Sequence, residues 1–254
     1  MSAPPVVIVT GASRGIGAAI VNRLRQARAS VVAVARSSTA AGSAKSSASH
    51  GERVHPIAAD IADPGACADV VRETLGTFGR LDALVNNAGI LAPVSRIADA
   101  DPGAWQYNLA VNLLGPFYLS RAAVPHLRAV GGRIVNISSG AAVKAIQGWS
   151  AYCVAKAALT HFTRQLAAEE PAITSVALRP GVVDTAMQEL IRQAGPSVMT
   201  PDKSAYFQAL KDRGQLLAPE IPARAAAWLA LAAPAELSGA FIDYDDPRLA
   251  AAYA

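Results

Sequence analysis

Residues 6–17, with the sequence Val-Val-Ile-Val-Thr-Gly-Ala-Ser-Arg-Gly-Ile-Gly, decide the fold of this chain. The apolar run from Val6 to Thr10 is typical of a buried parallel strand, and an apolar helical pattern begins at Ile16. Between them, the glycines permit a tight turn and the close approach of a pyrophosphate, while the start of the helix offers free N–H groups and a positive dipole end. An ordinary turn between a strand and a helix is the alternative. The order of strand, glycine turn and helix favours a dinucleotide site.

The rest of the chain continues this alternation of strand and helix. Apolar runs typical of strands occupy residues 30–36, 54–59, 81–85, 133–138, 173–178 and 240–244, and helical patterns occupy residues 63–78, 101–128, 150–169 and 221–232. Nothing in the pattern signals a second domain. We therefore predict an α/β fold: a single Rossmann-type domain over residues 1–254, with a doubly wound, seven-stranded parallel sheet and helices on both faces.

Three kinds of segment depart from this regular pattern. Residues 39–51 are rich in Ser, Ala and Gly and predict a loop. Residues 186–220 are long for a connection in a compact domain, so we expect this segment to cover a substrate. Prolines interrupt two helical patterns and predict kinks or breaks there: Pro116, Pro125, Pro196 and Pro201.

The composition limits the class of protein. The chain has 254 residues, of which 52% are hydrophobic and 17% charged, which is typical of a globular protein rather than a disordered one. No apolar run is long enough for a membrane span, and the start of the chain leads directly into a strand rather than a signal peptide. The basic residues are scattered, so we expect no nucleic-acid surface. The two cysteines, Cys67 and Cys153, are too few and too distant for a disulfide framework or a metal site, and a cytoplasmic location fits best.

The end of the second strand bears on the choice of cofactor. In dinucleotide folds an acid near this point holds the ribose 2′-hydroxyl of NAD, whereas an arginine accommodates the 2′-phosphate of NADP. Here Arg36 is followed by Ser37 and Ser38, and Arg14 in the glycine turn supplies a second cation. Guanidinium groups pair well with phosphate, so these residues favour NADPH, although Arg36 could be an ordinary solvated arginine.

Small and polar residues also follow the other strands. Asp60 and Ile61 end the third strand and suit an adenine, although Asp60 could instead cap a helix. Asn86-Asn87-Ala88-Gly89 end the fourth strand and leave room for a ligand. Ser139 and Pro180 follow the next two. Because the carboxyl ends of parallel strands meet at one edge of the sheet, these residues predict a ligand crevice there.

Tyr152 and Lys156 are the candidate catalytic pair. They lie four residues apart in an Ala-rich helical segment, so they share one face of the helix. A neighbouring ammonium favours the phenolate, and we expect the pKa of Tyr152 to lie closer to neutral than usual. Such a phenol can exchange a proton with a carbonyl or an alcohol. Two residues that merely share an exposed helix face are the alternative.

Taken together, these motifs resemble the short-chain dehydrogenase/reductase family. The likeness spans nearly the whole chain and rests on Thr10-Gly11-x-x-x-Gly15-x-Gly17, Asp60, Asn86-Asn87-Ala88-Gly89, Asn112, Ser139, Tyr152-x-x-x-Lys156 and Pro180-Gly181-x-x-x-Thr185. The resemblance implies that Tyr152 is the general acid and that Ser139, rather than its neighbour Ser138, stabilises the same oxygen. Lys156 would hold the nicotinamide ribose and lower the pKa of the tyrosine.

The resemblance also implies the remaining site residues. Asn112 would hold a water in a proton relay; from the sequence alone it could equally be a buried core amide. Thr185 and the backbone of Val183 would orient the nicotinamide. The full expected cofactor site comprises Gly11, Ser13, Arg14, Gly15, Ile16, Gly17, Arg36, Ser37, Asp60, Ile61, Asn86, Ala88, Gly89, Tyr152, Lys156, Pro180, Gly181, Val183 and Thr185.

A narrower likeness concerns the substrate. The stretches 148–157 and 238–247 resemble the sepiapterin-reductase and fungal benzil-reductase branch, whose members reduce one carbonyl of a 1,2-dicarbonyl with NADPH. By this likeness Asp243 would anchor a pterin-type substrate, but it could equally be a turn residue; Trp149 could be a pocket wall or a packing residue. The expected substrate contacts are Ser139, Trp149, Tyr152 and Asp243. Apolar residues beside them suit an aryl or alkyl ketone at least as well as a pterin: Ala141, Ala142, Val143 and Ile146.

The leading hypothesis is therefore an NADPH-dependent carbonyl reductase that acts on a small-molecule ketone. An NADP-dependent alcohol or sugar dehydrogenase is one alternative. A non-catalytic NADP-binding regulator is another, although such a protein would not need Ser139, Tyr152 and Lys156 together. The family likeness also implies a homodimer or homotetramer formed through the long helices near Asn112 and Tyr152.

Overall fold

A computed structural model describes residues 3–37 and 53–253 of the chain. The expected loop at residues 39–51 and Ser38 lie outside the described residues.

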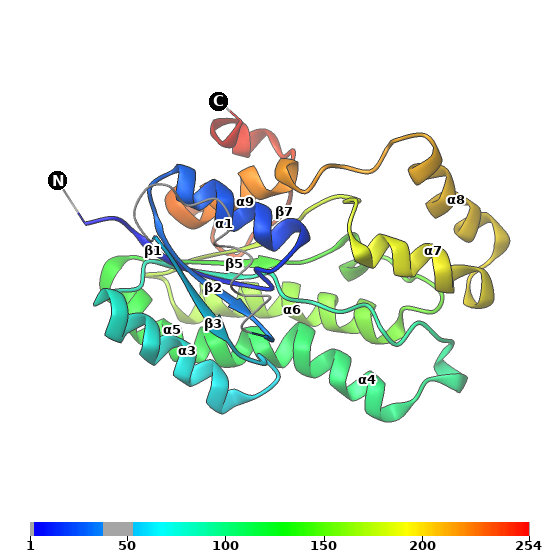
Figure 1. The fold of residues 1–254 in the computed structure, drawn as a ribbon, viewed down its shortest axis with the longest axis horizontal. Helices are drawn as coiled ribbons and strands as arrows, with labels where there is room; N and C mark the ends of the chain where they lie inside the picture. The colour runs from blue at the N-terminus through cyan, green and yellow to red at the C-terminus, as the bar shows by residue number, and fades with distance from the viewer. Residues whose placement is uncertain (1–2, 38–52, 254) are drawn as a thin grey trace.

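The core of the molecule is one sheet of seven parallel strands in the order β3-β2-β1-β4-β5-β6-β7 (Figure 1). The strand bounds are β1 Val6–Thr10, β2 Ser30–Ala35, β3 Val54–Ala58, β4 Ala83–Asn86, β5 Arg133–Ile137, β6 Thr174–Arg179 and β7 Phe241–Asp243. The predicted sheet is confirmed, because every neighbouring pair of strands is parallel. The order reverses between β1 and β4, and a ligand crevice is expected at such a point.

Helices cover both faces of the sheet. α1 (Gly15–Gln26) and α9 (Glu220–Ala232) pack on one face, while α3 (Pro64–Phe78), α5 (Gly115–Val130) and α6 (Ser150–Glu169) cover the other (Figure 1). Each side buries its own apolar cluster of mainly Val, Ile, Leu and Ala against the strands. Asp63 begins α3 as the sequence predicts, since its Oδ1 accepts hydrogen bonds from the N–H groups of Gly65 and Ala66. No helix within residues 3–37 and 53–253 is both long and apolar enough to cross a membrane.

The remaining helices lie toward the carboxyl ends of the strands. They are α4 (Pro102–Leu109), α7 (Ala186–Val198) and α8 (Pro201–Asp212), and Figure 1 shows α7 and α8 extending beyond the sheet on that side. Short 3₁₀ turns occupy Ile97–Asp99, Gly140–Ala142, Ala235–Leu237 and Pro247–Ala252.

The helices do not break at two of the four prolines, Pro125 and Pro196. α4 continues into α5 through a π-helical turn at Ala110–Leu114, and α5 then passes through Pro125 without ending. Pro125 cannot donate to the carbonyl of Arg121, but Arg121 is exposed, so water can satisfy that carbonyl. Pro196 likewise lies inside α7, and the break comes between α7 and α8 instead.

Candidate active site

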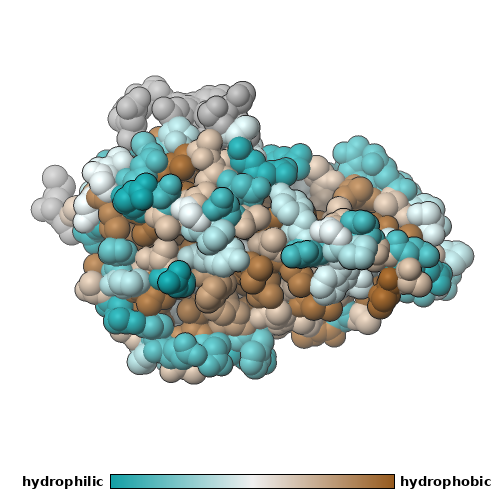
Figure 2. All heavy atoms as spheres, turned by 90° about the horizontal axis from the view of Figure 1, so that it is seen from below, coloured by the Kyte–Doolittle hydropathy of each residue, from teal (hydrophilic) through white to brown (hydrophobic). Residues whose placement is uncertain are grey.

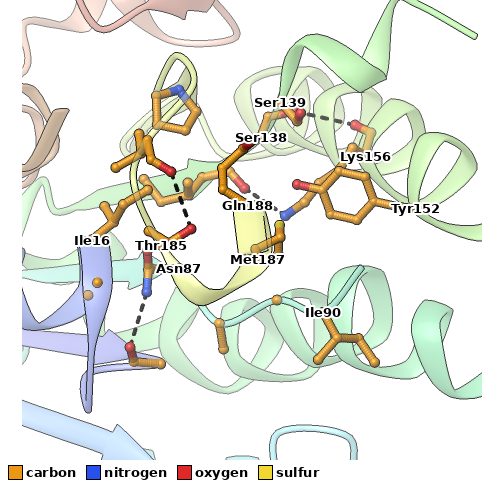
Figure 3. Close-up of a pocket in the computed structure, with 18 of the residues that line it drawn as sticks. Ile16, Asn87, Ile90, Ser138, Ser139, Tyr152, Lys156, Thr185, Met187 and Gln188 are labelled. Atoms are coloured by element: carbon orange, nitrogen blue, oxygen red, sulfur yellow. Dashed lines mark hydrogen bonds between the residues drawn. The ribbon is translucent and has the colours of Figure 1, made fainter. Parts of the chain in front are cut away.

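A continuous crevice of about 1810 Å³ runs along the carboxyl ends of the strands. It begins at the glycine turn after β1, passes the ends of β2 to β4, and ends among residues of α6, α7 and α8. Figure 3 shows Ile16, Asn87 and Thr185 at one side of this space and Tyr152 and Lys156 at the other. Among the described residues, the lining contains every expected site residue except Asn86 and Asn112.

The glycine turn is shaped for a close ligand. Gly11 has φ +63°, a conformation that side chains rarely adopt. A Cβ on Gly17 would lie 2.1 Å from the Gly11 carbonyl oxygen, so the helix start can approach the turn only because residue 17 is glycine. Thr10 Oγ1 accepts hydrogen bonds of 3.0 Å from the N–H groups of Asn87 and Ala88, which joins the turn to the end of β4. The first turn of α1 therefore faces the crevice with its N–H groups available.

Asn86 lies outside the lining of the crevice, because its side chain is buried. Its Nδ2 donates to Asn136 Oδ1 at 2.8 Å, on the neighbouring strand, and only 2% of the residue is exposed. The side chain that lines the crevice is the next one: Asn87 Nδ2 donates to the Thr10 carbonyl at 2.9 Å. Side chains alternate between opposite faces of a strand, so adjacent asparagines take different roles.

The expected contacts for the adenosine half lie together on the crevice wall. Arg14, Arg36 and Ser37 line it at the ends of β1 and β2, and both arginines are exposed. Asp60 and Ile61 line it after β3. The Asp60 carboxylate accepts from the Ala62 N–H at 3.0 Å and from the Tyr107 hydroxyl at 3.4 Å.

Ser139, Tyr152 and Lys156 meet at the other end of the crevice. Ser139 lies two residues after the end of β5, and Tyr152 and Lys156 lie in the first two turns of α6. Lys156 Nζ lies 5.6 Å from the centre of the Tyr152 ring and donates to the Ile137 carbonyl at 2.8 Å. Ser139 lies close enough to Tyr152 to lower its pKa, and its Oγ accepts from the Ala141 N–H at 3.1 Å. Ser138 points away from this group, because its hydroxyl bonds to Thr160 Oγ1 inside the core.

The expected shift of the Tyr152 pKa toward neutral is wrong. Burial raises the pKa of Tyr152 to about 12, and the neighbouring Ser139 side chain lowers it only in part. Burial also lowers the pKa of Lys156 to about 8. Desolvation outweighs the attraction between the pair, since the Lys156 ammonium lies over the tyrosine ring and bonds a carbonyl. Near neutral pH, Tyr152 is therefore a protonated phenol, ready to donate.

Asn112 lies behind this group, fully buried in the π-helical turn. Its Nδ2 donates to the Ile90 carbonyl at 2.8 Å and its Oδ1 accepts from the Ile90 N–H at 3.1 Å. A Cβ on Gly89 would lie 2.8 Å from Asn112 Oδ1 and 3.7 Å from Lys156 Nζ, so Gly89 brings the strand end close to both.

The segment after β6 closes the crevice opposite the glycine turn. Pro180, Gly181, Val183 and Thr185 all line it, and Gly181 has φ +78°. A Cβ on Gly15 would lie 3.2 Å from Thr185 Cγ2, so this segment lies directly over the glycine turn.

The residues expected to contact substrate line the same end of the crevice, but their side chains differ in how much they are already buried or paired. Trp149 is 5% exposed and packs edge-to-face on Tyr152, with 6.1 Å between ring centres. Asp243 lines the crevice, yet both of its oxygens accept from the guanidinium of Arg179, its cross-strand neighbour. Ala141 and Ile146 line the crevice, whereas Val143 is 64% exposed and, like Ala142, lies outside the lining.

Several residues of the crevice wall are absent from the sequence-based expectations. α7 contributes Met187, Gln188 and Ile191, which Figure 3 shows in part, and α8 contributes Lys203, Tyr206 and Phe207. The amphipathic patterns of both helices predict only that one face is buried, not that this face meets a crevice. The ion pair of Arg179 could have been predicted from the sequence, because Arg179 and Asp243 end two predicted strands that could be neighbours.

The residues present fit a nicotinamide dinucleotide. Gly11, Gly17 and Gly89 line the crevice, and a Cβ on any of them would overlap neighbouring protein atoms, so this close backbone packing requires glycine. Two exposed arginines, Arg14 and Arg36, line the same part of the crevice. Tyr152 and Lys156 lie at the far end of the same continuous space. In such a site Arg14 and Arg36 would hold the adenosine half, and Lys156, Val183 and Thr185 the nicotinamide half.

Comparison with known proteins supports this description. The family model for short chain dehydrogenase matches residues 5–195. The chain is 37% identical over 255 residues to a benzil reductase ((S)-benzoin forming) of Saccharomyces cerevisiae, covering 96% of this chain and 97% of that protein. It is 33% identical over 229 residues to a benzil reductase ((S)-benzoin forming) of Bacillus cereus, covering 86% and 91%.

A solved structure agrees with these relatives. The crystal structure of a short chain dehydrogenase/reductase from Saccharomyces cerevisiae matches with a TM-score of 0.93 and 37% identity, covering 97% of this chain and 98% of that one. Sequence, sheet order and site geometry thus agree, and the resemblance found in the motifs is confirmed. The chain belongs to the short-chain dehydrogenase/reductase family, whose members are oxidoreductases that use a nicotinamide cofactor.

Proposed function

We propose that the protein is a cytoplasmic, NADPH-dependent carbonyl reductase that reduces one carbonyl of a 1,2-dicarbonyl such as benzil. The observation that carries this proposal is the meeting of Ser139, Tyr152 and Lys156 at one end of a crevice whose other end holds two exposed arginines. The two benzil reductases among its relatives support the choice of substrate class.

The protonation states favour reduction. The cofactor, when bound, supplies a hydride to the carbonyl carbon. Tyr152, with a pKa of about 12, holds its proton near neutral pH and donates it to the carbonyl oxygen as negative charge develops there. Ser139 donates to the same oxygen and stabilises that charge. Lys156, with a pKa of about 8, is charged near neutral pH and stabilises the resulting phenolate until it is protonated again.

The cofactor preference follows from Arg14 and Arg36, which line the crevice at the ends of β1 and β2. Two guanidinium groups can pair with a 2′-phosphate, and in this position a ribose hydroxyl gains less from them. We expect NADPH to bind at least about ten-fold tighter than NADH, which is about 1.4 kcal/mol. Arg36→Asp should narrow or reverse the preference in a fluorescence titration. Equal affinities in the unchanged protein would contradict the roles of both arginines.

A substrate panel with NADPH tests the proposed reaction. Benzil-type diketones, pterins, quinones and simple ketones should be compared, and the diketones should give the highest kcat/KM. Tyr152→Phe serves as the control, because it removes the proton donor and keeps the ring. A reductase loses turnover in this variant while it still binds NADPH. No NADPH oxidation with any compound in the panel would refute the proposal and favour a binding role.

We also propose that the protein forms a homodimer or homotetramer through α5 and α6. Figure 2 shows hydrophobic residues gathered on the helix-covered face below the sheet in Figure 1. Leu114, Phe117 and Val154, at or near these helices, are 39%, 41% and 48% exposed. Phe117 and Phe162 touch across the two helices, with 6.1 Å between ring centres. Light scattering should give a mass of two or four chains, and Phe117→Glu should reduce it; a monomeric unchanged protein would contradict the proposal.

A further inference from the structure

We propose that Trp149, Tyr206 and Phe207 form an aryl-binding wall that makes the enzyme prefer carbonyl compounds with an aromatic substituent. This inference rests on the proposed carbonyl reduction and names the feature of the substrate that the site recognises. The wall joins α6, which carries Tyr152 and Lys156, to α8, which lies within the segment 186–220 that the sequence predicts to cover a substrate.

The three aromatic residues form a continuous row that starts at the catalytic tyrosine. Trp149 packs edge-to-face on Tyr152 and stacks on Phe207, with 5.5 Å between ring centres and 30° between the planes. Phe207 in turn packs edge-to-face on Tyr206 at 5.2 Å. All four residues line the crevice. A group bound along this row is therefore next to the oxygen that donates the proton.

The backbone holds this row in place. Gly148 has φ +80°, and a Cβ there would lie 2.6 Å from Val198 Cγ2, so the turn that presents Trp149 packs closely under the end of α7. The side chain of Gln147 accepts from the Thr200 N–H at 2.9 Å, directly before the first residue of α8. The segment before α6 therefore contacts both the last residue of α7, Val198, and the residue that precedes α8, Thr200.

Burial separates the roles of the three residues. Trp149 and Phe207 are 5% and 7% exposed, so each presents little of its surface to the crevice and is fixed by packing. Tyr206 is 49% exposed and carries Lys203 Nζ at 5.6 Å from its ring centre. The part of this ring that stays exposed on the crevice wall can pack against a ligand. Aromatic rings favour such edge-to-face and offset contacts beyond simple area burial.

The surroundings suit an aryl group rather than a charged one. Ala141, Ile146, Met187 and Ile191 line the crevice beside the row, and Ala141 and Ile191 share a buried cluster with Trp149, Tyr152 and Phe207. An aromatic ring gains dispersion and burial in such a pocket, whereas a methyl group in the same position leaves part of it unfilled.

The test compares three vicinal dicarbonyls that differ in aromatic content: benzil, 1-phenyl-1,2-propanedione and 2,3-butanedione, each with NADPH. The unchanged enzyme should show kcat/KM values that fall in that order. Phe207→Leu and Tyr206→Leu remove the rings and keep apolar bulk. Each should lower the ratio of kcat/KM for benzil to that for butanedione at least ten-fold, mainly through a higher KM for benzil. Tyr206→Phe keeps the ring and should retain most of the ratio.

Controls separate this inference from the proposed function. Tyr253→Leu removes a tyrosine ring that is 37% exposed and lies outside the crevice lining, so it should not alter the ratio. If Phe207→Leu loosens α8 and fails to fold, Tyr206→Leu still decides the matter, because that side chain is half-exposed. Unchanged ratios in the leucine variants, or an unchanged enzyme that prefers butanedione, would overturn the aryl wall while leaving carbonyl reduction intact. Failure to reduce any of the three compounds would instead refute the proposed function.

Discussion

Replacing Lys156 by methionine should make the protein without bound cofactor more stable near neutral pH, even though it removes part of the proposed catalytic group. Burial lowers the pKa of Lys156 from 10.5 to about 8. Each pKa unit corresponds to about 1.4 kcal/mol, so the folded protein bears a cost of about 3 kcal/mol for the buried charge. Methionine has similar length and no charge, and it relieves this cost.

Part of the gain is offset by a lost hydrogen bond. Lys156 Nζ donates to the Ile137 carbonyl at 2.8 Å, and methionine cannot. A buried carbonyl without a partner costs about 1–3 kcal/mol. The expected net result at pH 7 is a variant that is more stable by about 1 kcal/mol.

The pH dependence gives this prediction its sharpest form. Because the pKa of Lys156 in the folded protein, about 8, lies below its ordinary value of 10.5, the unfolded chain holds more protons between these pH values. The free energy of unfolding of the unchanged protein therefore gains from this residue as the pH rises above 8. The variant has no such term, so its advantage should shrink above pH 8 and reverse by about pH 9.5. Tyr152 has the opposite sign: its pKa is raised from 10.0 to about 12, so its stabilising effect is lost above pH 10, beyond this range.

Urea unfolding at pH 7, 8, 9 and 9.5, followed by tryptophan fluorescence, provides the measurement. Groups that titrate in both proteins, such as Cys67 with a pKa of about 12, cancel when the difference between the two proteins is taken. Lys144→Met is the matched control, because Lys144 is an exposed lysine on the same crevice and its loss relieves no burial. A difference that does not vary with pH, or a Lys156→Met protein less stable by more than about 1 kcal/mol at pH 7, would refute the reasoning.

Three further predictions concern Tyr152, the proposed proton donor, and two glycines. Tyr152→Phe should lower kcat about 10²- to 10⁴-fold with little change in NADPH affinity, measured by turnover and fluorescence titration; turnover within three-fold of the unchanged enzyme would exclude Tyr152 as the proton donor. Gly17→Ala should weaken NADPH binding at least ten-fold, because its Cβ would lie 2.1 Å from the Gly11 carbonyl oxygen; unchanged affinity in the same titration would show that the turn is not the cradle. Gly148→Ala should cost about 2 kcal/mol or more of unfolding free energy, because φ is +80° and Val198 occupies the space, and a urea midpoint equal to that of the unchanged protein would contradict this.

The sequence did not predict which way the side chains at the strand ends point. Asn86 and Asn87 are identical in the sequence, but the first faces Asn136 in the core and the second lines the crevice. The choice depends on where the alternation of β4 stops, and a residue pattern does not locate that point to within one residue. The Asp243 carboxylate forms an ion pair with Arg179, 64 residues earlier in the chain. Its partner therefore depends on which strands become neighbours in the sheet.

The sequence by itself determined the seven-stranded α/β architecture, the place of the crevice and many of the residues that line it. These follow from local patterns: runs of apolar residues, the spacing of glycines, and the four-residue step from Tyr152 to Lys156. Only the tertiary structure decided the protonation states of that pair, since burial by α6 and its neighbours outweighs the proximity of the ammonium. It also decided that α8 reaches Trp149, because contacts between helices distant in sequence depend on how they pack, and no local pattern encodes that packing.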